Sequence, residues 1–387
     1  MRSALFSHVK RIVVKVGSSV ISDAKGLMPE VIADISRDLC ALADKGYEVI
    51  LVSSGAVAAG KGALGIEGRP KTIPLKQAAA AIGQSRLMKA YKEQFLAQSH
   101  QVAQVLLTRD DLANRRRYLN ARNTLMTLLE YGIVPIINEN DTVVVDEIRF
   151  GDNDNLSALV ANLMEAELLV ILSDVDGLYD RDPNRSSQAR LIPEVERITP
   201  RIEALAGGTG SSLGTGGMQT KLKAAKRAAL SGIGTVIVNG RNPGVLCRLV
   251  SGEDLGTYFL PECNRMAAKK HWIAFTKKCR GKLFVDAGAA NAVLQGGKSL
   301  LPSGVKGVDG SFDRGDAVRL CDMEGREFAR GVVNYSLQEL LRILGRKSGE
   351  IEGILGYKYG DEVVHRDNLV LGERRQEASQ GGTLSAD

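Results

Sequence analysis

The sequence predicts an α/β protein with a mostly parallel central sheet, followed by a smaller β-rich unit. Through roughly the first 250 residues, short β-branched apolar runs alternate with longer helical patterns, which is the order of a layered α/β domain. The apolar runs lack polar alternation, so we expect strands that are buried on both faces. Beyond about residue 280, short strand-like runs punctuated by glycine predict the β-rich unit.

The predicted elements alternate along the chain as this fold class requires. The β-branched runs that predict strands are residues 11–16, 48–52, 102–107, 133–137, 168–172 and 235–238. The helical patterns between them are residues 29–43, 75–98, 114–130, 155–164 and 218–230. In the C-terminal unit, strands are expected at residues 282–285, 317–321 and 329–333.

The composition is typical of a globular chain with two domains. With 387 residues, 44% of them hydrophobic, the chain can bury sizeable cores. The formal net charge of +6 is modest and does not by itself demand a nucleic-acid partner. Five dispersed cysteines without a Cys-x-x-Cys pair argue against a disulfide framework or a zinc site. Because neither a signal peptide nor a membrane-length apolar stretch is apparent, we expect a cytoplasmic protein.

A candidate site lies at the carboxyl ends of the predicted strands, where open α/β sheets bind ligands. Small, polar or charged residues follow four of these strands, at residues 15–19, 53–56, 138–141 and 173–177. Lys15 ends the first strand. A lysine in a buried strand is costly unless it meets a negative partner or reaches solvent, so Lys15 is a candidate for binding an anion.

A second lysine follows a glycine-rich loop. Residues 213–217 precede a lysine-rich helical run, so that backbone N–H groups, a helix N-terminus and Lys221 can converge on a phosphate. The loop is not a P-loop, because it lacks Gly-Lys followed by Ser or Thr, and taken alone it is also compatible with a plain connector. Together, Lys15 and Lys221 can place an ammonium group on each flank of a transferring phosphoryl group.

A dense polar block, residues 151–155, comes directly before an apolar helical run. One Asp or Asn can serve as the helix N-cap, but four in succession exceed that role. They can hold an ammonium group, a metal or the lysines that contact a phosphate. The four histidines are scattered away from these motifs. A site without histidine suits an acceptor that is already ionised, such as a carboxylate, because that acceptor needs no general base.

Taken together, these segments resemble a known family. Residues 14–19, 53–56, 137–141, 151–158 and 213–221, in this order, are similar to the motifs of the amino acid kinase family. Residues 299–302, 310–316 and 325–327 look like a PUA domain. The resemblance implies a three-layer αβα sandwich with a mostly parallel central sheet. It divides the chain into a kinase domain (1–262), a linker (263–281), a PUA domain (282–371) and a disordered tail (372–387).

The resemblance also implies which residues form the site. Catalysis falls on Lys15, Lys221 and Asp154, with Asp154 organising the two lysines. Glutamate binding falls on Ser54, Asp141 and Asn153. The ATP contacts fall on Lys15, Gly17, Ser173, Asp174, Thr215, Gly216, Gly217, Met218, Gln219, Thr220 and Lys221. Ser173 stands where the family often has threonine, and the resemblance assigns no protein ligand to a metal.

The implied activity is transfer of the γ-phosphoryl group of ATP to the side-chain carboxylate of L-glutamate. The product is L-glutamyl 5-phosphate, the first intermediate of proline biosynthesis from glutamate. ATP is the co-substrate, and Mg²⁺ bridges its oxygens while taking few ligands from the protein. Proline is expected as a feedback inhibitor. Further expected partners are a glutamyl phosphate reductase and other copies of the chain, in a dimer or tetramer.

Two alternatives stay open from the sequence. Within the family, the acceptor can instead be aspartate, acetylglutamate or carbamate. The alternative of a different class is RNA binding by the C-terminal unit, where exposed aromatic side chains would stack on bases. Phe312, Tyr335, Tyr357 and Tyr359 can either do this or fill a small core. We rank RNA binding below a regulatory or assembly role for this unit.

Overall fold

The computed structural model describes residues 6, 8–24, 26–68, 70–143, 153–183, 185–206, 217–262 and 279–371. The chain divides into two compact units, Met1–Arg265 and Met266–Asp387. Most of the predicted linker (263–281) and all of the predicted tail (372–387) lie outside the described residues. The four cysteines within them, Cys40, Cys247, Cys279 and Cys321, are free thiols. None of the described helices combines the length and apolar content needed to cross a membrane.

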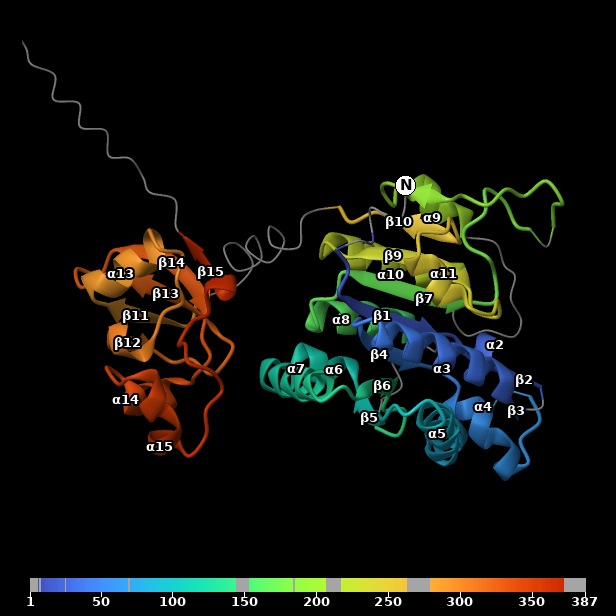
Figure 1. Cartoon of the computed structure of the whole chain (residues 1–387), viewed down its shortest axis with the longest axis horizontal. Coiled ribbons are helices and arrows are strands. Elements are labelled where there is room, and N and C mark those ends of the chain that lie inside the picture. Colours follow the sequence, from blue (N-terminus) through green and yellow to red (C-terminus); the bar gives the residue numbers. More distant parts are fainter. Residues whose placement is uncertain are drawn as a thin grey trace, which may run out of the picture. The chain divides into compact units, whose positions relative to one another are not determined.

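The first unit is built on an eight-stranded, mostly parallel sheet (Figure 1). Its strand order is β5-β6-β4-β1-β7-β9-β10-β8, so β1 lies near the centre. All neighbouring strands run parallel except β10, which pairs antiparallel with β9. The strands are β1 (Arg11–Val16), β4 (Glu48–Ser53), β5 (Val102–Leu107), β6 (Val134–Glu139), β7 (Leu168–Ser173), β8 (Glu194–Val195), β9 (Gly234–Asn239) and β10 (Thr257–Phe259).

Helices cover both faces of this sheet, which confirms the predicted three-layer αβα sandwich. One core packs α3, α5 and α11 against one face, and a second core packs α7, α8 and α10 against the other. The helices are α2 (Ser18–Ile21), α3 (Pro29–Asp44), α4 (Ala56–Lys61), α5 (Ile73–Leu96), α6 (Arg109–Ala113), α7 (Arg115–Glu130), α8 (Asn153–Leu163), α9 (Pro200–Leu205), α10 (Met218–Leu230) and α11 (Val245–Val250). A small hairpin joins β2 (Ser22–Asp23) to β3 (Gly26–Leu27).

The alternation of side chains along β1 decides where Lys15 lies. Successive residues of a strand face opposite sides of the sheet. Ile12, Val14 and Val16 belong to the core under α3 and α5, whereas Val13 belongs to the core under α8 and α10. Lys15 therefore faces the α8 and α10 layer, at the carboxyl end of a central strand and only 4% exposed.

The structure corrects two details of the predicted elements. The strand at residues 102–107 was expected to be buried on both faces, but β5 is an edge strand and several of its side chains are at least partly exposed. The helix expected at residues 155–164 begins earlier, because α8 already includes Asn153 and Asp154. These two polar residues therefore belong to the first helical turn, where a carboxylate is stabilised by the helix dipole.

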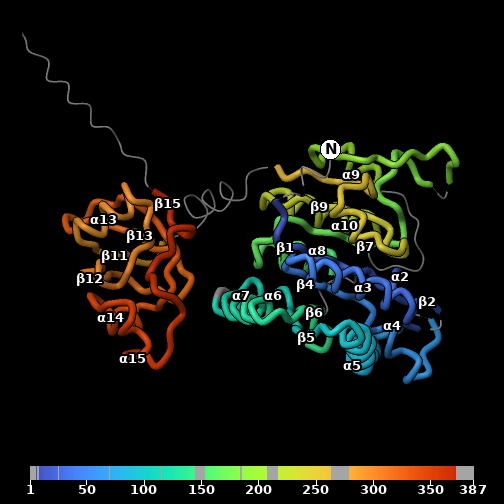
Figure 2. Tube along the Cα trace, in the orientation of Figure 1, coloured from blue at the N-terminus to red at the C-terminus, as the bar shows by residue number. Residues whose placement is uncertain are grey.

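Helices α4 and α5 lie side by side and touch through their backbones (Figure 2). A Cβ atom added to Gly83 would lie 1.7 Å from the carbonyl oxygen of Ala56, and one added to Gly60 would lie 1.9 Å from that of Ala79. No side chain larger than hydrogen fits at either glycine unless the helices separate. This contact fixes α5 against the residues that follow β4.

The second unit, taken by itself, contains a five-stranded sheet in the order β12-β11-β13-β14-β15. This agrees with the predicted β-rich unit. Its strands are β11 (Gly281–Val285), β12 (Val305–Gly310), β13 (Ala317–Cys321), β14 (Glu327–Val332) and β15 (Leu369–Leu371). Its helices are α13 (Ala287–Leu294), α14 (Leu337–Ile343) and α15 (Ile351–Leu355).

The four aromatic residues of the second unit divide between core and surface. Phe312 and Tyr335 are buried, and both belong to the core of the unit. Tyr357 and Tyr359 are 41% and 45% exposed, with the Arg314 guanidinium 3.5 Å from the centre of the Tyr359 ring. The first pair therefore serves packing, while the second pair forms a small exposed aromatic cluster beside an arginine.

Replacing Gly83 with alanine should destabilise the first unit. Because the new methyl group would overlap the Ala56 carbonyl, we expect the free energy of unfolding to fall by about 1–3 kcal/mol or more, as for other overpacked cores. Urea denaturation followed by circular dichroism measures this change.

The matched control for that variant is Gly62→Ala. Gly62 has φ −64° and ψ −31°, and a Cβ there meets nothing within 4 Å. This change should leave stability unchanged or raise it slightly. Equal stability of the Gly83 and Gly62 variants would contradict the close contact between α4 and α5.

Candidate active site

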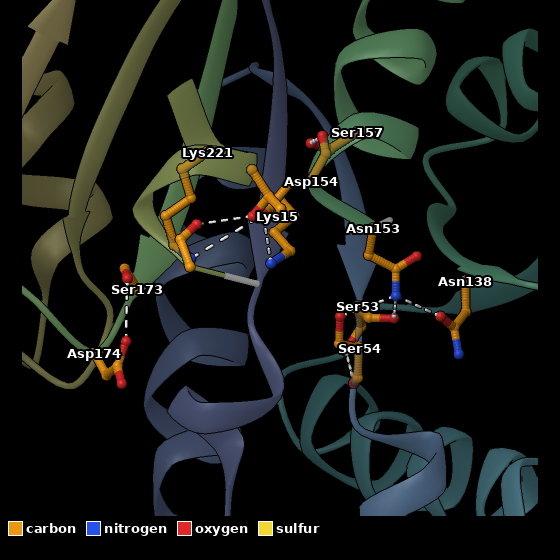
Figure 3. Close-up of polar contacts among 12 residues, drawn as sticks. Lys15, Ser53, Ser54, Asn138, Asn153, Asp154, Ser157, Ser173, Asp174 and Lys221 are labelled. Carbon is orange, nitrogen blue, oxygen red and sulfur yellow. Dashed lines mark hydrogen bonds and ion pairs between the residues drawn. The ribbon is translucent and has the colours of Figure 1, made fainter. Parts of the chain in front are cut away.

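Asp154 joins three elements at the carboxyl edge of the sheet. Its Oδ1 atom lies 2.5 Å from Nζ of Lys15 on β1, and its Oδ2 atom lies 3.8 Å from Nζ of Lys221 on α10. Thr220 Oγ1 also donates a hydrogen bond to Oδ2, at 2.5 Å. Figure 3 shows both lysines directed at this one carboxylate. The structure thus brings the three predicted catalytic residues together.

Burial makes this arrangement electrostatically strong. Asp154 is 1% exposed, and Lys15 and Lys221 are nearly as buried. Burial alone would raise the pKa of Asp154, but the two ammonium groups and the Thr220 hydroxyl hold that pKa below its usual value. The pKa of Lys221 is lowered, mainly by burial. The attraction of Asp154 opposes this shift, and the repulsion of Lys15 adds to it. Two buried cations held by one anion leave one positive charge uncompensated among these three groups.

A second polar cluster lies beside the first, where α8 begins. Nδ2 of Asn153 donates to Ser54 Oγ and to Asn138 Oδ1, both at 2.9 Å (Figure 3). Asn138, at the end of β6, in turn donates from Nδ2 to Oε1 of Gln84 at 2.7 Å. Residues from β6, α5, α8 and the loop after β4 therefore meet in one chain of amide groups.

A backbone N–H fixes the direction of every amide in this chain. The Glu139 N–H can only donate, and it lies 2.8 Å from Oδ1 of Asn138. The other end of the Asn138 amide must then be its NH₂ group, so the Gln84 atom facing it is the oxygen. By the same reasoning, Asn153 turns its nitrogen toward Asn138.

With the amides oriented in this way, one hydrogen-bond acceptor and one donor of the cluster remain without a partner among the described residues. Asn153 Oδ1 and Gln84 Nε2 are both buried and have no hydrogen-bond partner among the residues that the structure describes. Buried polar atoms are rarely left in this state, because each lost hydrogen bond costs on the order of 1–3 kcal/mol. The two atoms are candidate contacts for a bound molecule.

Asp141 has a different environment from Asp154. It lies after β6, 3.5 Å from Nζ of Lys76 on α5. Burial raises the pKa of Asp141, and the Lys76 ammonium only partly offsets this effect. Asp141 is therefore a buried carboxylate paired with one ammonium group, and such a carboxylate can bind a second one.

Only some of the residues predicted to contact the nucleotide lie in the described part of the chain. Ser173 ends β7, and its hydroxyl donates a hydrogen bond to Asp174 Oδ1 at 3.2 Å. Gly17 follows β1, where its N–H donates to the Leu172 carbonyl and an added Cβ would lie 3.6 Å from Nζ of Lys15. A Cβ at Gly17 would thus touch the lysine at an ordinary contact distance, and the Gly17 N–H serves the fold.

The loop before α10 is described only from Gly217 onward. Gly217 is the N-cap residue of α10, Met218 packs on the core, and Gln219 is exposed. The Thr220 hydroxyl bonds to Asp154, so it supports the carboxylate in addition to its predicted place in the ATP loop. Thr215 and Gly216, both predicted to contact ATP, lie outside the described residues.

Three residues of the site were missed by the sequence analysis: Gln84, Lys76 and, as a named site residue, Asn138. Asn138 carried a signal, since it stands at the end of a buried apolar strand within one of the four polar loops. Gln84 and Lys76 carried none, because both lie in a long helix that contains many polar residues. Only the contact of α5 with the sheet edge reveals them.

Comparison with known proteins agrees with this geometry. The model of the amino acid kinase family matches residues 10–239, and the model of the PUA domain matches residues 281–355. The first match covers more than half of the chain and includes Lys15, Asp154 and Lys221. This chain belongs to the amino acid kinase family.

Individual members of the amino acid kinase family are similar to this chain over nearly its whole length. A protein of Syntrophotalea carbinolica is 67% identical over 371 residues, which are 96% of this chain and 100% of that protein. A protein of Geobacter sulfurreducens is 59% identical, with the same coverage of both chains. One of Stutzerimonas stutzeri is 54% identical over 94% of this chain and 98% of its own length. All three are named glutamate 5-kinase.

Replacing Asp154 with asparagine should destabilise the fold, because it leaves two buried ammonium groups without their anion. Breaking a buried ion pair on one side typically costs about 3–5 kcal/mol. Since the pKa of Asp154 is lowered in the fold, its stabilising contribution is present at neutral pH and is lost as the pH falls through that lowered pKa. Urea denaturation at pH 7 and at acidic pH measures both effects.

Asp34→Asn is the control, since Asp34 forms an exposed ion pair with Arg37 on α3. Exposed pairs contribute about 0–1 kcal/mol, so this variant should unfold almost as the unaltered protein does. If the Asp154 and Asp34 variants had the same stability at pH 7, the central role of Asp154 in the fold would be wrong.

Proposed function

We propose that this chain catalyses ATP-dependent phosphorylation of the side-chain carboxylate of L-glutamate, giving L-glutamyl 5-phosphate. This is the first step of proline biosynthesis from glutamate. The observation that carries the proposal is the buried group of Lys15, Asp154 and Lys221, with the amide cluster of Asn153 beside it. The names of the nearly full-length relatives support glutamate as the acceptor.

The two lysines act on the phosphoryl group during transfer. A carboxylate oxygen attacks the γ-phosphorus of ATP, a new O–P bond forms, and the bond to the β-phosphate oxygen breaks to release ADP. Negative charge on the transferring group is neutralised by Lys15 and Lys221, which Asp154 holds in fixed positions. Since the attacking carboxylate is already ionised, no general base is required.

Substrate binding falls to residues of the second cluster. Asn153 Oδ1, a buried acceptor, and the buried carboxylate of Asp141 suit the α-ammonium group of an amino acid. Ser54, whose hydroxyl accepts from Asn153, helps to fix the same substrate. An amino acid bound through these residues would lie next to the two lysines, because Asn153 directly precedes Asp154.

The nucleotide and its metal use the loops after β1 and β7 and the start of α10. We assign the ATP contacts to Lys15, Gly17, Ser173, Asp174 and residues 215–221. The described residues contain no group of three or more His, Cys, Asp or Glu side chains placed to hold a metal. Mg²⁺ brought by ATP would neutralise phosphate charge and take few ligands from the protein.

The remaining assignments concern regulation and assembly. We assign residues 1–262 to the kinase domain, 263–281 to a linker, 282–371 to the PUA domain and 372–387 to a tail. The PUA domain serves regulation or assembly, and RNA binding is the secondary candidate, favoured by exposed Tyr357 and Tyr359 beside Arg314. Proline inhibits as the pathway end product, and the chain works in the cytoplasm as a dimer or tetramer that supplies a glutamyl phosphate reductase.

A turnover assay with a panel of acceptors tests the proposed function. We expect ATP-dependent ADP release with L-glutamate, and little with aspartate, acetylglutamate or bicarbonate plus ammonia. Added hydroxylamine should trap the acyl phosphate as a hydroxamate. Inhibition by proline in the same assay tests the regulatory assignment. Preference for another acceptor would overturn glutamate as the substrate.

Removing either lysine should lower kcat far more than it weakens glutamate binding. Each lysine meets charge that develops on the phosphoryl group, so we expect Lys15→Ala and Lys221→Ala to reduce kcat by about 10²–10³-fold, as for other groups that stabilise a transition state. Lys223→Ala is the matched control, since Lys223 is exposed on the same helix as Lys221. A raised glutamate KM with unchanged kcat would contradict this role.

A further inference from the structure

We propose that Gln84 binds the α-carboxylate of the amino acid substrate, and that it thereby selects α-amino acids over molecules that carry only the side-chain carboxylate. The inference rests on the proposed function, since it adds a contact to the same substrate site. It gives a role to a residue that the sequence motifs do not contain.

The first ground is the unpaired donor. The Glu139 N–H fixes Asn138, and Asn138 fixes Gln84 so that its oxygen is used within the protein and its Nε2 group is not. Nε2 is buried and has no hydrogen-bond partner in the described part of the chain. A buried N–H donor without a partner is destabilising, so it favours binding of an acceptor. A carboxylate accepts a stronger hydrogen bond from an amide N–H than a neutral acceptor does.

The second ground is the complementary atom in the same cluster. Asn153 Oδ1 is an unpaired acceptor, and only Asn138 stands between the amides of Asn153 and Gln84. One acceptor and one donor, both buried and both without partners among the described residues, match an α-ammonium group and an α-carboxylate. A zwitterionic amino acid carries the donor and the acceptor that these two atoms lack.

The third ground is the need to tell two carboxylates apart. Glutamate carries an α-carboxylate and a side-chain carboxylate, and only the second must reach Lys15 and Lys221. A neutral amide donor at Gln84 binds the α-carboxylate without competing with the lysines for the reacting one. Gln84 also follows Gly83, whose contact with the Ala56 carbonyl holds this part of α5 beside the end of β4.

The test replaces the donor of Gln84 with an acceptor, and separately replaces the α-carboxylate acceptor of the substrate with a donor. Gln84→Glu has nearly the same shape, keeps an oxygen for Asn138 and replaces the Nε2 donor with an acceptor. L-isoglutamine, the α-amide of glutamate, keeps the reacting carboxylate and offers an NH₂ donor in place of the α-carboxylate. Turnover of both substrates by both proteins gives four values of kcat/KM.

We expect Gln84→Glu to lower kcat/KM for L-glutamate by at least about 10- to 100-fold, because it removes one hydrogen bond to a charged group and sets a second carboxylate against the α-carboxylate. The same variant should lose little or gain with L-isoglutamine, so that the preference between the two substrates moves toward the amide by at least about tenfold. Calorimetric titration of L-glutamate in the absence of ATP should show the same weakening, independent of turnover.

Gln94→Glu is the matched control, because Gln94 lies on the same helix ten residues further on, about 15 Å along its axis. It should change neither substrate. An equal loss with both substrates in Gln84→Glu would overturn the inference and leave Gln84 as a support for Asn138. If the unaltered protein turned over neither substrate nor bound glutamate, the proposed function itself would fail, which is a different result.

Discussion

The site depends on one buried carboxylate that serves two cations. Lys15 comes from a central strand and Lys221 from a helix more than 200 residues later, yet both reach Asp154. Neither lysine can be buried without that anion, because desolvation of an ammonium group is costly. The helix that carries Asp154, the strand that carries Lys15 and the start of α10 are therefore tied together by charge as well as by their apolar core.

This constraint also explains how the folded protein can exist before a nucleotide binds. Asp154 neutralises one of the two cations, and the Asp174 carboxylate also attracts Lys221. The two ammonium groups are the cations that an anionic phosphoryl group would meet. The amide cluster beside them is neutral, so the two halves of the site offer different chemistry to the two ends of an amino acid.

Much of this could be predicted from the sequence, for a physical reason. Parallel strands buried on both faces leave unbroken apolar runs, and polar residues directly after them must lie on one sheet edge. This rule located Lys15, Ser54 and Ser173, and it put Asn138 in a polar loop without naming it as a site residue. Gln84 and Lys76 could not be found in this way. Their positions depend on where α5 packs against the sheet edge, and nothing in the local pattern of a long polar-rich helix specifies that.

The contact between Gly83 and the Ala56 carbonyl has a further consequence. Two backbones in direct contact leave no flexible side chains between them to absorb a displacement. Helix α5 has 24 residues, and Gln84 lies close to its middle, next to this contact. A tilt imposed at either end of α5 would therefore pivot at this contact and rotate the Gln84 amide beside it.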